Sequence, residues 1–176
     1  MHFDNLVFCG GGNRCFWQAG FWSALAPALH RQPSGVVAVS AGAAMYRDTI
    51  LATPLYVPVQ ECRTPQDLAD LIMASSCVPP LTPRAQRSGL EVLDGGLVAN
   101  VPLDPSRRQG GRTLVLLSRR LHRLPLVPGH AFVQPSATIA AGTWDYTNDV
   151  NLQATFDLGR RDGLAYVESQ TIRDEL

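Results

Sequence analysis

Three short motifs hold the groups that could do chemistry in this chain. AVSAG at 38–42 places a serine between small residues at the end of the apolar run 35–39. Small neighbours let a strand turn sharply into a helix, and such a turn forces the serine hydroxyl outward. The pattern favours Ser40 as a nucleophile, with Ala38 and Gly42 as the flanking positions of a nucleophile elbow. A serine that only caps a helix is the alternative.

The second motif is a glycine loop, GGGNR at 10–14, which follows the apolar run 6–9 and precedes a stretch with helical spacing. Backbone N–H groups of glycines at the start of a helix are unobstructed and lie at its positive end, so they suit an anion. A dinucleotide site is disfavoured, because Cys15 stands where the GxGxxG pattern needs a glycine. A tight turn without a ligand is the alternative.

The third motif lies in LDGGLVANVP at 93–102, where a short apolar strand delivers Asp94 into the turn Gly95-Gly96. Desolvation raises the pKa of a carboxylate buried beside a serine with no cation nearby, and this makes the carboxylate a better base. Asp94 is therefore the candidate general base for Ser40. A residue that only forms the turn is the alternative.

The elements that must position these motifs follow from hydrophobic spacing and from capping residues. Strands are expected at 6–9, 35–39, 55–59, 91–93 and 113–118. Helices are expected at 13–26, from Ala43 to Met45, at 64–76 and at 152–167. In the last of these helices, Gly159 and Gly163 permit close packing against a neighbour. Near-continuous apolar strands that alternate with helices predict an α/β fold with a mainly parallel central sheet covered on both faces. We expect the motifs to follow successive parallel strands, because such sheets build their sites at the carboxyl ends of strands.

Composition excludes several classes of function. The chain has 176 residues, a net charge of zero and 15 basic residues, all of them arginine, so lysine-based chemistry is ruled out. Because the net charge is zero, the chain lacks the excess positive charge by which proteins usually attract nucleic acid. The His, Cys and Asp residues do not cluster at metal-ligand spacings, so neither a metal nor a cofactor is expected.

Targeting signals are also not apparent. The start of the chain, residues 1–5, lacks the charged and apolar regions of a signal peptide, and no apolar run approaches the roughly 20 residues that span a bilayer. We therefore expect a cytoplasmic protein. Peripheral contact with a membrane is left open, and it would have to be mostly apolar because the net charge is zero.

Taken in order, GGGNR, AVSAG and DGGLVANVP resemble the patatin-like phospholipases, which are lipid acyl hydrolases with a three-layer α/β/α sandwich fold. The stretches ASSCVPP at 74–80, WDYTN at 144–148 and DLGRRDG at 157–163 are similar to that family too. The resemblance implies that Ser40 is the nucleophile and Asp94 its base, a dyad without histidine.

By the same resemblance, the N–H groups of Gly11 and Gly12 form an oxyanion hole, with Gly10 shaping the loop and Arg14 bracing it. The implied function is phospholipase A-type hydrolysis of a phospholipid or another acyl lipid in lipid catabolism, without a cofactor. Two alternatives stay open. One is an inactive lipid-binding protein with the same fold, and the other is a Ser-His-Asp esterase that uses His122 or His130.

Two features depart from the family: Cys15 stands where the family usually has glycine, and the middle section is short. Only residues 41–93 lie between Ser40 and Asp94, where patatin-like proteins resemble one another in having a much longer middle section. We therefore expect residues 1–176 to form a single patatin-like domain in which segments are missing near Met45/Tyr46 and near Thr53/Pro54. The sequence does not indicate an oligomeric state.

Overall fold

The computed structural model describes residues 1–38, 43–45, 53–54, 57, 62–80, 82–87, 89–95, 100–103, 110–145 and 147–174. The expected elbow residues 39–42, with Ser40 and Gly42 among them, lie outside the described residues, as does Gly96. The strand expected over 55–59 lies almost wholly outside them as well.

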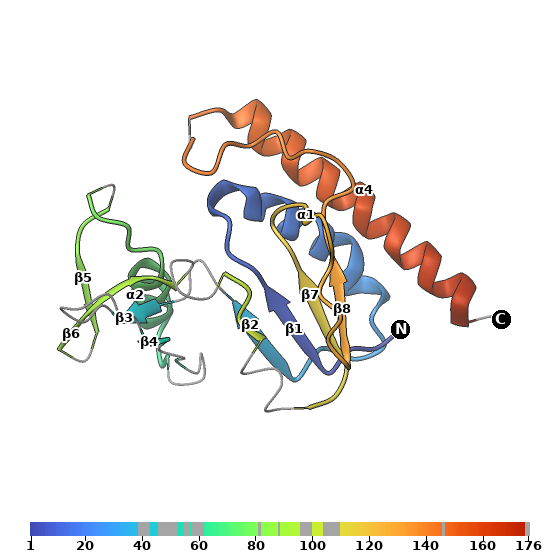
Figure 1. The fold of residues 1–176 in the computed structure, drawn as a ribbon, viewed down its shortest axis with the longest axis horizontal. Helices are drawn as coiled ribbons and strands as arrows, with labels where there is room; N and C mark the ends of the chain where they lie inside the picture. Colours follow the sequence, from blue (N-terminus) through green and yellow to red (C-terminus); the bar gives the residue numbers. More distant parts are fainter. Residues whose placement is uncertain are drawn as a thin grey trace.

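A parallel four-stranded sheet forms the centre of the molecule (Figure 1). Its strands are β1 (Asn5–Phe8), β2 (Gly35–Ala38), β7 (Thr113–Leu116) and β8 (His130–Val133), in the order β2-β1-β7-β8. All three pairings are parallel. The expected α/β class with a mainly parallel central sheet is thereby confirmed, and β8 is a strand that hydrophobic spacing did not predict.

Two helices pack together along this sheet. The 3-10 turn η1 (Gly12–Arg14) leads into α1 (Cys15–Leu25), and a second 3-10 turn, η2 (Ala26–Ala28), follows α1. The long helix α4 (Asp149–Asp174) lies along α1 (Figure 1). The main core forms between these helices and the sheet. Its buried members are Phe3, Leu6, Trp17, Phe21, Leu25, Leu114, Leu116 and Leu158.

Glycines set the distance between the two helices. A Cβ on Gly20 would come within 2.0 Å of the Phe156 carbonyl oxygen, and a Cβ on Gly163 within 2.6 Å of the Phe21 carbonyl oxygen. The backbones therefore touch where side chains would otherwise separate them. This contact confirms the close packing expected from the glycines of the last helix.

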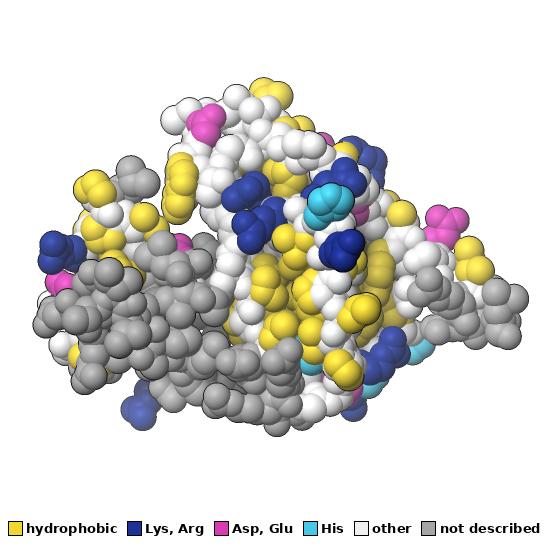
Figure 2. All heavy atoms as spheres, viewed as in Figure 1, with side chains coloured by type: hydrophobic (Ala, Val, Ile, Leu, Met, Phe, Trp, Pro, Cys, Tyr) yellow, Lys and Arg dark blue, Asp and Glu magenta, His cyan; other side chains and the backbone are white. Residues whose placement is uncertain are grey.

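The other face of the sheet carries a second buried cluster of Val7, Cys9, Val115 and Leu117. Val101, Leu121 and Phe132 are among the partly buried side chains packed against it. Figure 2 shows apolar side chains gathered over the region where Figure 1 draws β1, β7 and β8. Val101, near the end of the Asp94 motif, and Leu103, just after it, are thus held against this sheet.

A second, antiparallel sheet has the order β4-β3-β6-β5. It consists of β3 (Ala43–Met45), β4 (Thr53–Pro54), β5 (Ala85–Arg87) and β6 (Leu90–Asp94), next to α2 (Pro65–Ser75). The side chain of Thr64 accepts a hydrogen bond from the Asp67 N–H, and Asp67 returns one to the Thr64 backbone. This capping box confirms the helix start expected at Thr64-Pro65.

Two expectations about this region are wrong. Ala43–Met45 is a strand and not a helix, because three residues cannot repay the cost of nucleating a helix, whereas β6 and β4 offer ready hydrogen-bonding partners. The strand that ends at Asp94 is not part of the parallel sheet. It pairs antiparallel with β5 across a short turn through Gly89, and a contact so local in sequence costs little chain entropy.

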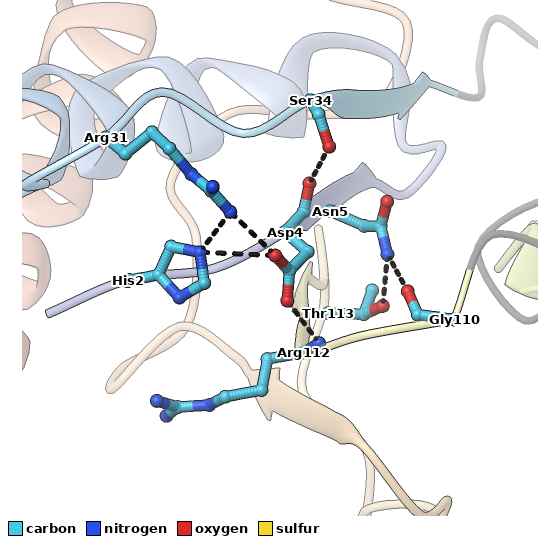
Figure 3. Close-up of polar contacts among 8 residues, drawn as sticks. All are labelled: His2, Asp4, Asn5, Arg31, Ser34, Gly110, Arg112 and Thr113. Carbon is cyan, nitrogen blue, oxygen red and sulfur yellow. Dashed lines mark hydrogen bonds and ion pairs between the residues drawn. The ribbon is translucent and has the colours of Figure 1, made fainter.

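The amino ends of the parallel strands are tied together by a polar cluster around Asp4 (Figure 3). Its carboxylate accepts hydrogen bonds from the Arg31 guanidinium and from the Arg112 N–H, both at 2.9 Å, and it lies 3.1 Å from His2 Nε2. The backbone hydrogen bond from Arg112, more than the charges of His2 and Arg31, holds the pKa of Asp4 below its ordinary value. A hollow of about 500 Å³ at this edge, on Asp4 and Gly110, lies at the opposite end of the sheet from the glycine loop.

Candidate active site

The glycine loop leaves the carboxyl end of β1 and runs directly into η1 and α1. The Gly10 N–H donates a hydrogen bond to the carbonyl oxygen of Asn100 at 3.2 Å. Asn100 belongs to the DGGLVANVP stretch that begins beside Asp94. The fold therefore brings the glycine loop GGGNR and the Asp94 motif into contact, although β6 lies in the other sheet.

Three successive carbonyl groups at the loop, those of Cys9, Gly10 and Gly11, each accept a hydrogen bond from a side chain. The Gln18 amide donates to the carbonyl oxygens of Cys9 and Leu116, both at 2.8 Å, and Gln18 is itself buried. The Ser118 hydroxyl donates to the carbonyl oxygen of Gly10. The Arg14 Nε donates to the carbonyl oxygen of Gly11 at 3.4 Å.

Two backbone N–H groups of the loop, those of Gly11 and Gly12, are open, meaning that they donate to no described residue. Gly10 differs, because its N–H already donates a hydrogen bond to the Asn100 carbonyl oxygen. The two open donors stand at the start of a helix, where an anion is stabilised.

A second segment of the chain holds the far side of the loop. Buried Asn13 donates from its side-chain amide to the carbonyl oxygen of Asp145 at 2.6 Å, and its N–H donates to Thr143 at 3.1 Å. Gly12 has a φ of 55°, and a Cβ there would come within 2.2 Å of the Thr143 carbonyl oxygen. Only glycine fits at this position of the loop.

Asp94 ends β6 with 7% of its surface exposed, and its N–H donates to the carbonyl oxygen of Cys77 at 2.8 Å. The negative charge of its carboxylate opposes ionisation of the thiol of Cys15, the first residue of α1. Burial raises the pKa of the Cys15 thiol to about 11, with the Arg14 guanidinium opposing the rise and the Asp94 carboxylate adding to it. The Asp94 carboxylate is thus near enough to the start of α1 to influence the Cys15 thiol, and Gly95 is buried beside Asp94.

Both flanks of Ser40 are placed by strand pairing, although Ser40 itself lies outside the described residues. Ala38 ends β2 opposite Phe8, at the same sheet edge from which the glycine loop departs. Ala43 opens β3 directly opposite Asp94. The described chain thus ends at Ala38 beside the loop and resumes at Ala43 beside Asp94.

The two candidate histidines differ in position. His130 starts β8 opposite Thr113, at the amino ends of the strands, where its Nδ1 lies 2.9 Å from the Pro128 carbonyl oxygen. This is the opposite edge of the sheet from the glycine loop. His122 follows β7 at the carboxyl edge and is exposed.

Two further properties bear on cofactors and membranes. Within the described ranges, no group of three or more His, Cys, Asp or Glu side chains is placed to hold a metal ion, and the four cysteines are free thiols. No helix in the described part of the chain combines the length and apolar character needed to cross a bilayer.

The sequence patterns did not predict the contacts that Gln18, Ser118 and Asn13 make at this site. Each is a buried polar side chain whose hydrogen bond reaches a loop carbonyl or a distant segment. Ser118 is separated from Gly10 by most of the chain, so no local pattern relates the two. A buried polar residue at the end of an apolar strand, as at Ser118, was the available signal.

The fold and the site define an α/β protein with a glycine loop at the carboxyl edge of a parallel sheet. Two N–H groups of this loop donate to no described residue, and the carboxylate of Asp94 is buried. The family of patatin-like phospholipases matches the chain in two segments, residues 6–46 and 46–106, which together cover more than half of it. The chain belongs to the patatin-like phospholipase family. Membership implies lipid acyl hydrolase activity. No curated protein shows significant similarity to the chain.

Proposed function

We propose that this protein hydrolyses the carboxylic ester bond of a phospholipid or another acyl lipid through a Ser40-Asp94 dyad. The observation that carries the proposal is the placement of the two flanks of Ser40. Ala38 lies beside the glycine loop and Ala43 lies opposite Asp94. Ser40 follows Ala38 by two residues, so chain geometry limits their Cα separation to roughly 7 Å.

Each group has one role in the reaction. The Ser40 hydroxyl oxygen attacks the ester carbonyl carbon while its proton passes to the Asp94 carboxylate. The oxyanion that forms accepts hydrogen bonds from the N–H groups of Gly11 and Gly12, which are open in the described structure. Collapse of this intermediate breaks the ester bond, and the leaving alcohol takes the proton from Asp94.

The second half of the reaction runs the same steps with water. A water molecule attacks the acyl group on Ser40 and gives a proton to Asp94. Collapse then releases the fatty acid, and the proton returns from Asp94 to the serine oxygen. No cofactor or metal enters either half-reaction.

An apolar hollow between the first turn of α1 and the start of α4 is the candidate site for the acyl chain. It has a volume of about 350 Å³ and is lined by Phe16, Leu152 and Phe156, with Asp149 and Gln153 beside them. Phe16 stands two residues after Arg14, in the first turn of α1, and is 43% exposed. Phe16→Ala should therefore lower kcat/KM for an octanoyl ester more than for an acetyl ester, whereas Leu164→Ala, an exposed control on α4, should change neither.

The dyad is tested by turnover of p-nitrophenyl butyrate with the wild type, Ser40→Ala and Asp94→Asn, each checked by circular dichroism. Loss of at least about 1,000-fold in kcat in both folded variants is expected for groups that act in the reaction itself. Turnover that survives in Ser40→Ala would remove the dyad. Parallel loss in His122→Ala would favour the Ser-His-Asp alternative instead.

Labelling by a fluorophosphonate probe distinguishes the enzyme from an inactive lipid-binding protein. The probe reacts only with an activated serine, so the proposal expects labelling of the wild type and none of Ser40→Ala. A folded wild type that binds phospholipid vesicles but takes up no probe would support the binding protein.

We also propose that residues 1–176 form a single domain and that segments of the natural chain are missing near Met45/Tyr46 and near Thr53/Pro54. Two observations support a break near the first junction: the family match divides at residue 46, and β3 replaces the expected elbow helix. Tryptic mapping of the protein isolated from its natural source tests it. Peptides 32–47 and 48–63 at the masses of the printed sequence would show a naturally short chain, and longer peptides would show the missing segments.

A further inference from the structure

The Ser118 hydroxyl lies under the glycine loop, on a part of the chain that the dyad does not use. Ser118 follows β7, is 2% exposed, and donates its hydrogen bond to the carbonyl oxygen of Gly10. A Cβ on Gly11 would come within 2.3 Å of this hydroxyl oxygen, so the Ser118 side chain is packed directly against the loop.

The peptide bond between Gly10 and Gly11 links this contact to the proposed oxyanion hole. In a planar trans peptide the carbonyl group of one residue and the N–H of the next point in opposite directions. A group that fixes the Gly10 carbonyl therefore also fixes the direction of the Gly11 N–H. That N–H is one of the two donors that remain open in the described structure.

Glycine makes such an anchor necessary. A Gly-Gly peptide rotates at little steric cost, because neither residue has a Cβ to restrict it. The two neighbouring peptides have anchors of their own, from Gln18 on the Cys9 carbonyl and from Arg14 on the Gly11 carbonyl. Among the described residues, the Ser118 hydroxyl is what holds the carbonyl between them.

We infer that Ser118 is a positioning residue that aims the Gly11 N–H at the oxyanion. The inference rests on the proposed function, since it assigns Ser118 to the same site. Ser118 touches neither substrate nor Ser40 in this role and acts only through the Gly10 peptide. Its loss should therefore weaken stabilisation of the transition state while substrate binding is kept.

The test compares Ser118→Ala with Ser23→Ala, a control whose hydroxyl also donates to a glycine carbonyl, that of Gly20, at 2.7 Å. With p-nitrophenyl butyrate, Ser118→Ala should lower kcat by about 10- to 100-fold and change KM less than about twofold, because a misdirected donor loses part of its contribution. Ser23→Ala should change neither constant. Ser118→Cys, which keeps the shape but is a weaker donor, should fall between them and serves if the alanine variant does not fold.

A second measurement needs no turnover. In protein labelled with ¹⁵N-glycine, the amide signal of Gly11 should shift or broaden in Ser118→Ala and stay in place in Ser23→Ala. Unchanged kcat, or an unchanged Gly11 signal, would overturn the inference while leaving the dyad intact. A folded wild type without any turnover would instead remove the proposed function, and the Gly11 signal alone would then decide whether Ser118 holds the loop.

Discussion

The carbonyl oxygen of Trp17 on α1 lies against Gly159 on α4, so closely that a Cβ built on Gly159 would come within 2.0 Å of it. The contact lies between α1 and α4, in the layer that helps form the main core. In an exposed helix, alanine would be more stable than glycine by about 1 kcal/mol. Here the steric clash with backbone atoms reverses that preference.

Gly159→Ala should accordingly lower the free energy of unfolding by about 3 kcal/mol or more, because α4 has to move away from α1 and leave the core poorly packed. Urea denaturation followed by circular dichroism measures the change. Gly142→Ala is the control, since its new Cβ comes no closer than 3.4 Å to its nearest neighbour, the Asp145 Cβ, and it should cost less than about 1 kcal/mol. Equal effects of the two substitutions would contradict the role of the helix contact.

Asp162 on α4 fixes the indole of buried Trp17 and the loop at Ser136. Its Oδ2 accepts hydrogen bonds from Trp17 Nε1 at 2.7 Å and from the Ser136 N–H at 3.0 Å. Asp162→Ala should destabilise the protein by about 2 kcal/mol, because the indole N–H of a fully buried side chain loses its acceptor. Asp157→Ala, which removes an exposed contact with Gln153 on the same helix, should stay within about 0.5 kcal/mol in the same urea titration.

The thiols of Cys9 and Cys15 make stability fall at high pH. Burial, with a smaller contribution from Cys15, raises the pKa of Cys9 from its ordinary value of 9.0 to about 12. A group whose pKa is raised on folding contributes stability that is complete below pH 9 and is lost as the pH rises toward 12. Each such thiol should lower the free energy of unfolding by up to about 1.4 kcal/mol per pH unit in this window.

Cys9→Ala should therefore make the decline between pH 9 and pH 12 less steep, as followed by urea denaturation at several pH values. Val7→Ala is the matched control, because it removes a buried neighbour from the same cluster but no titratable group. It should lower the whole curve and leave its slope unchanged. A slope that is equally steep in Cys9→Ala and in the wild type would show that the Cys9 thiol is not the cause.

Asp4 should give the opposite dependence at low pH. Its lowered pKa means that the Asp4 carboxylate stabilises the fold above its ordinary pKa of 3.8, and that this contribution is lost as the pH falls through the lower, folded value. A ¹³C NMR titration of the carboxyl group should give a midpoint below 3.8. Arg31→Ala should raise the midpoint only in part, because the hydrogen bond from the Arg112 N–H remains and is the largest cause. A wild-type midpoint at or above 3.8 would contradict this account.

Local sequence patterns determined the elements whose cause is itself local. The apolar runs of β1, β2 and β7 mark buried parallel strands, Thr64 and Pro65 mark the start of α2, and the glycines of α4 mark a helix that packs closely. The order of the three motifs also identified the family. Each of these signals is complete within a few residues, so it can be read without knowing which segments meet.

Only the tertiary structure decided how these pieces meet. It placed the Asp94 strand in an antiparallel sheet, made a strand of Ala43–Met45, and brought the Ser118 hydroxyl beneath Gly10. Ser118 and Gly10 are 108 positions apart in the chain. Their contact depends on the parallel pairing of β1 with β7, and such pairing is set by competition among distant segments for hydrogen bonds and buried surface. Local composition does not contain the result of that competition, which is why the sequence indicated candidate groups and only the fold revealed the contacts around the glycine loop.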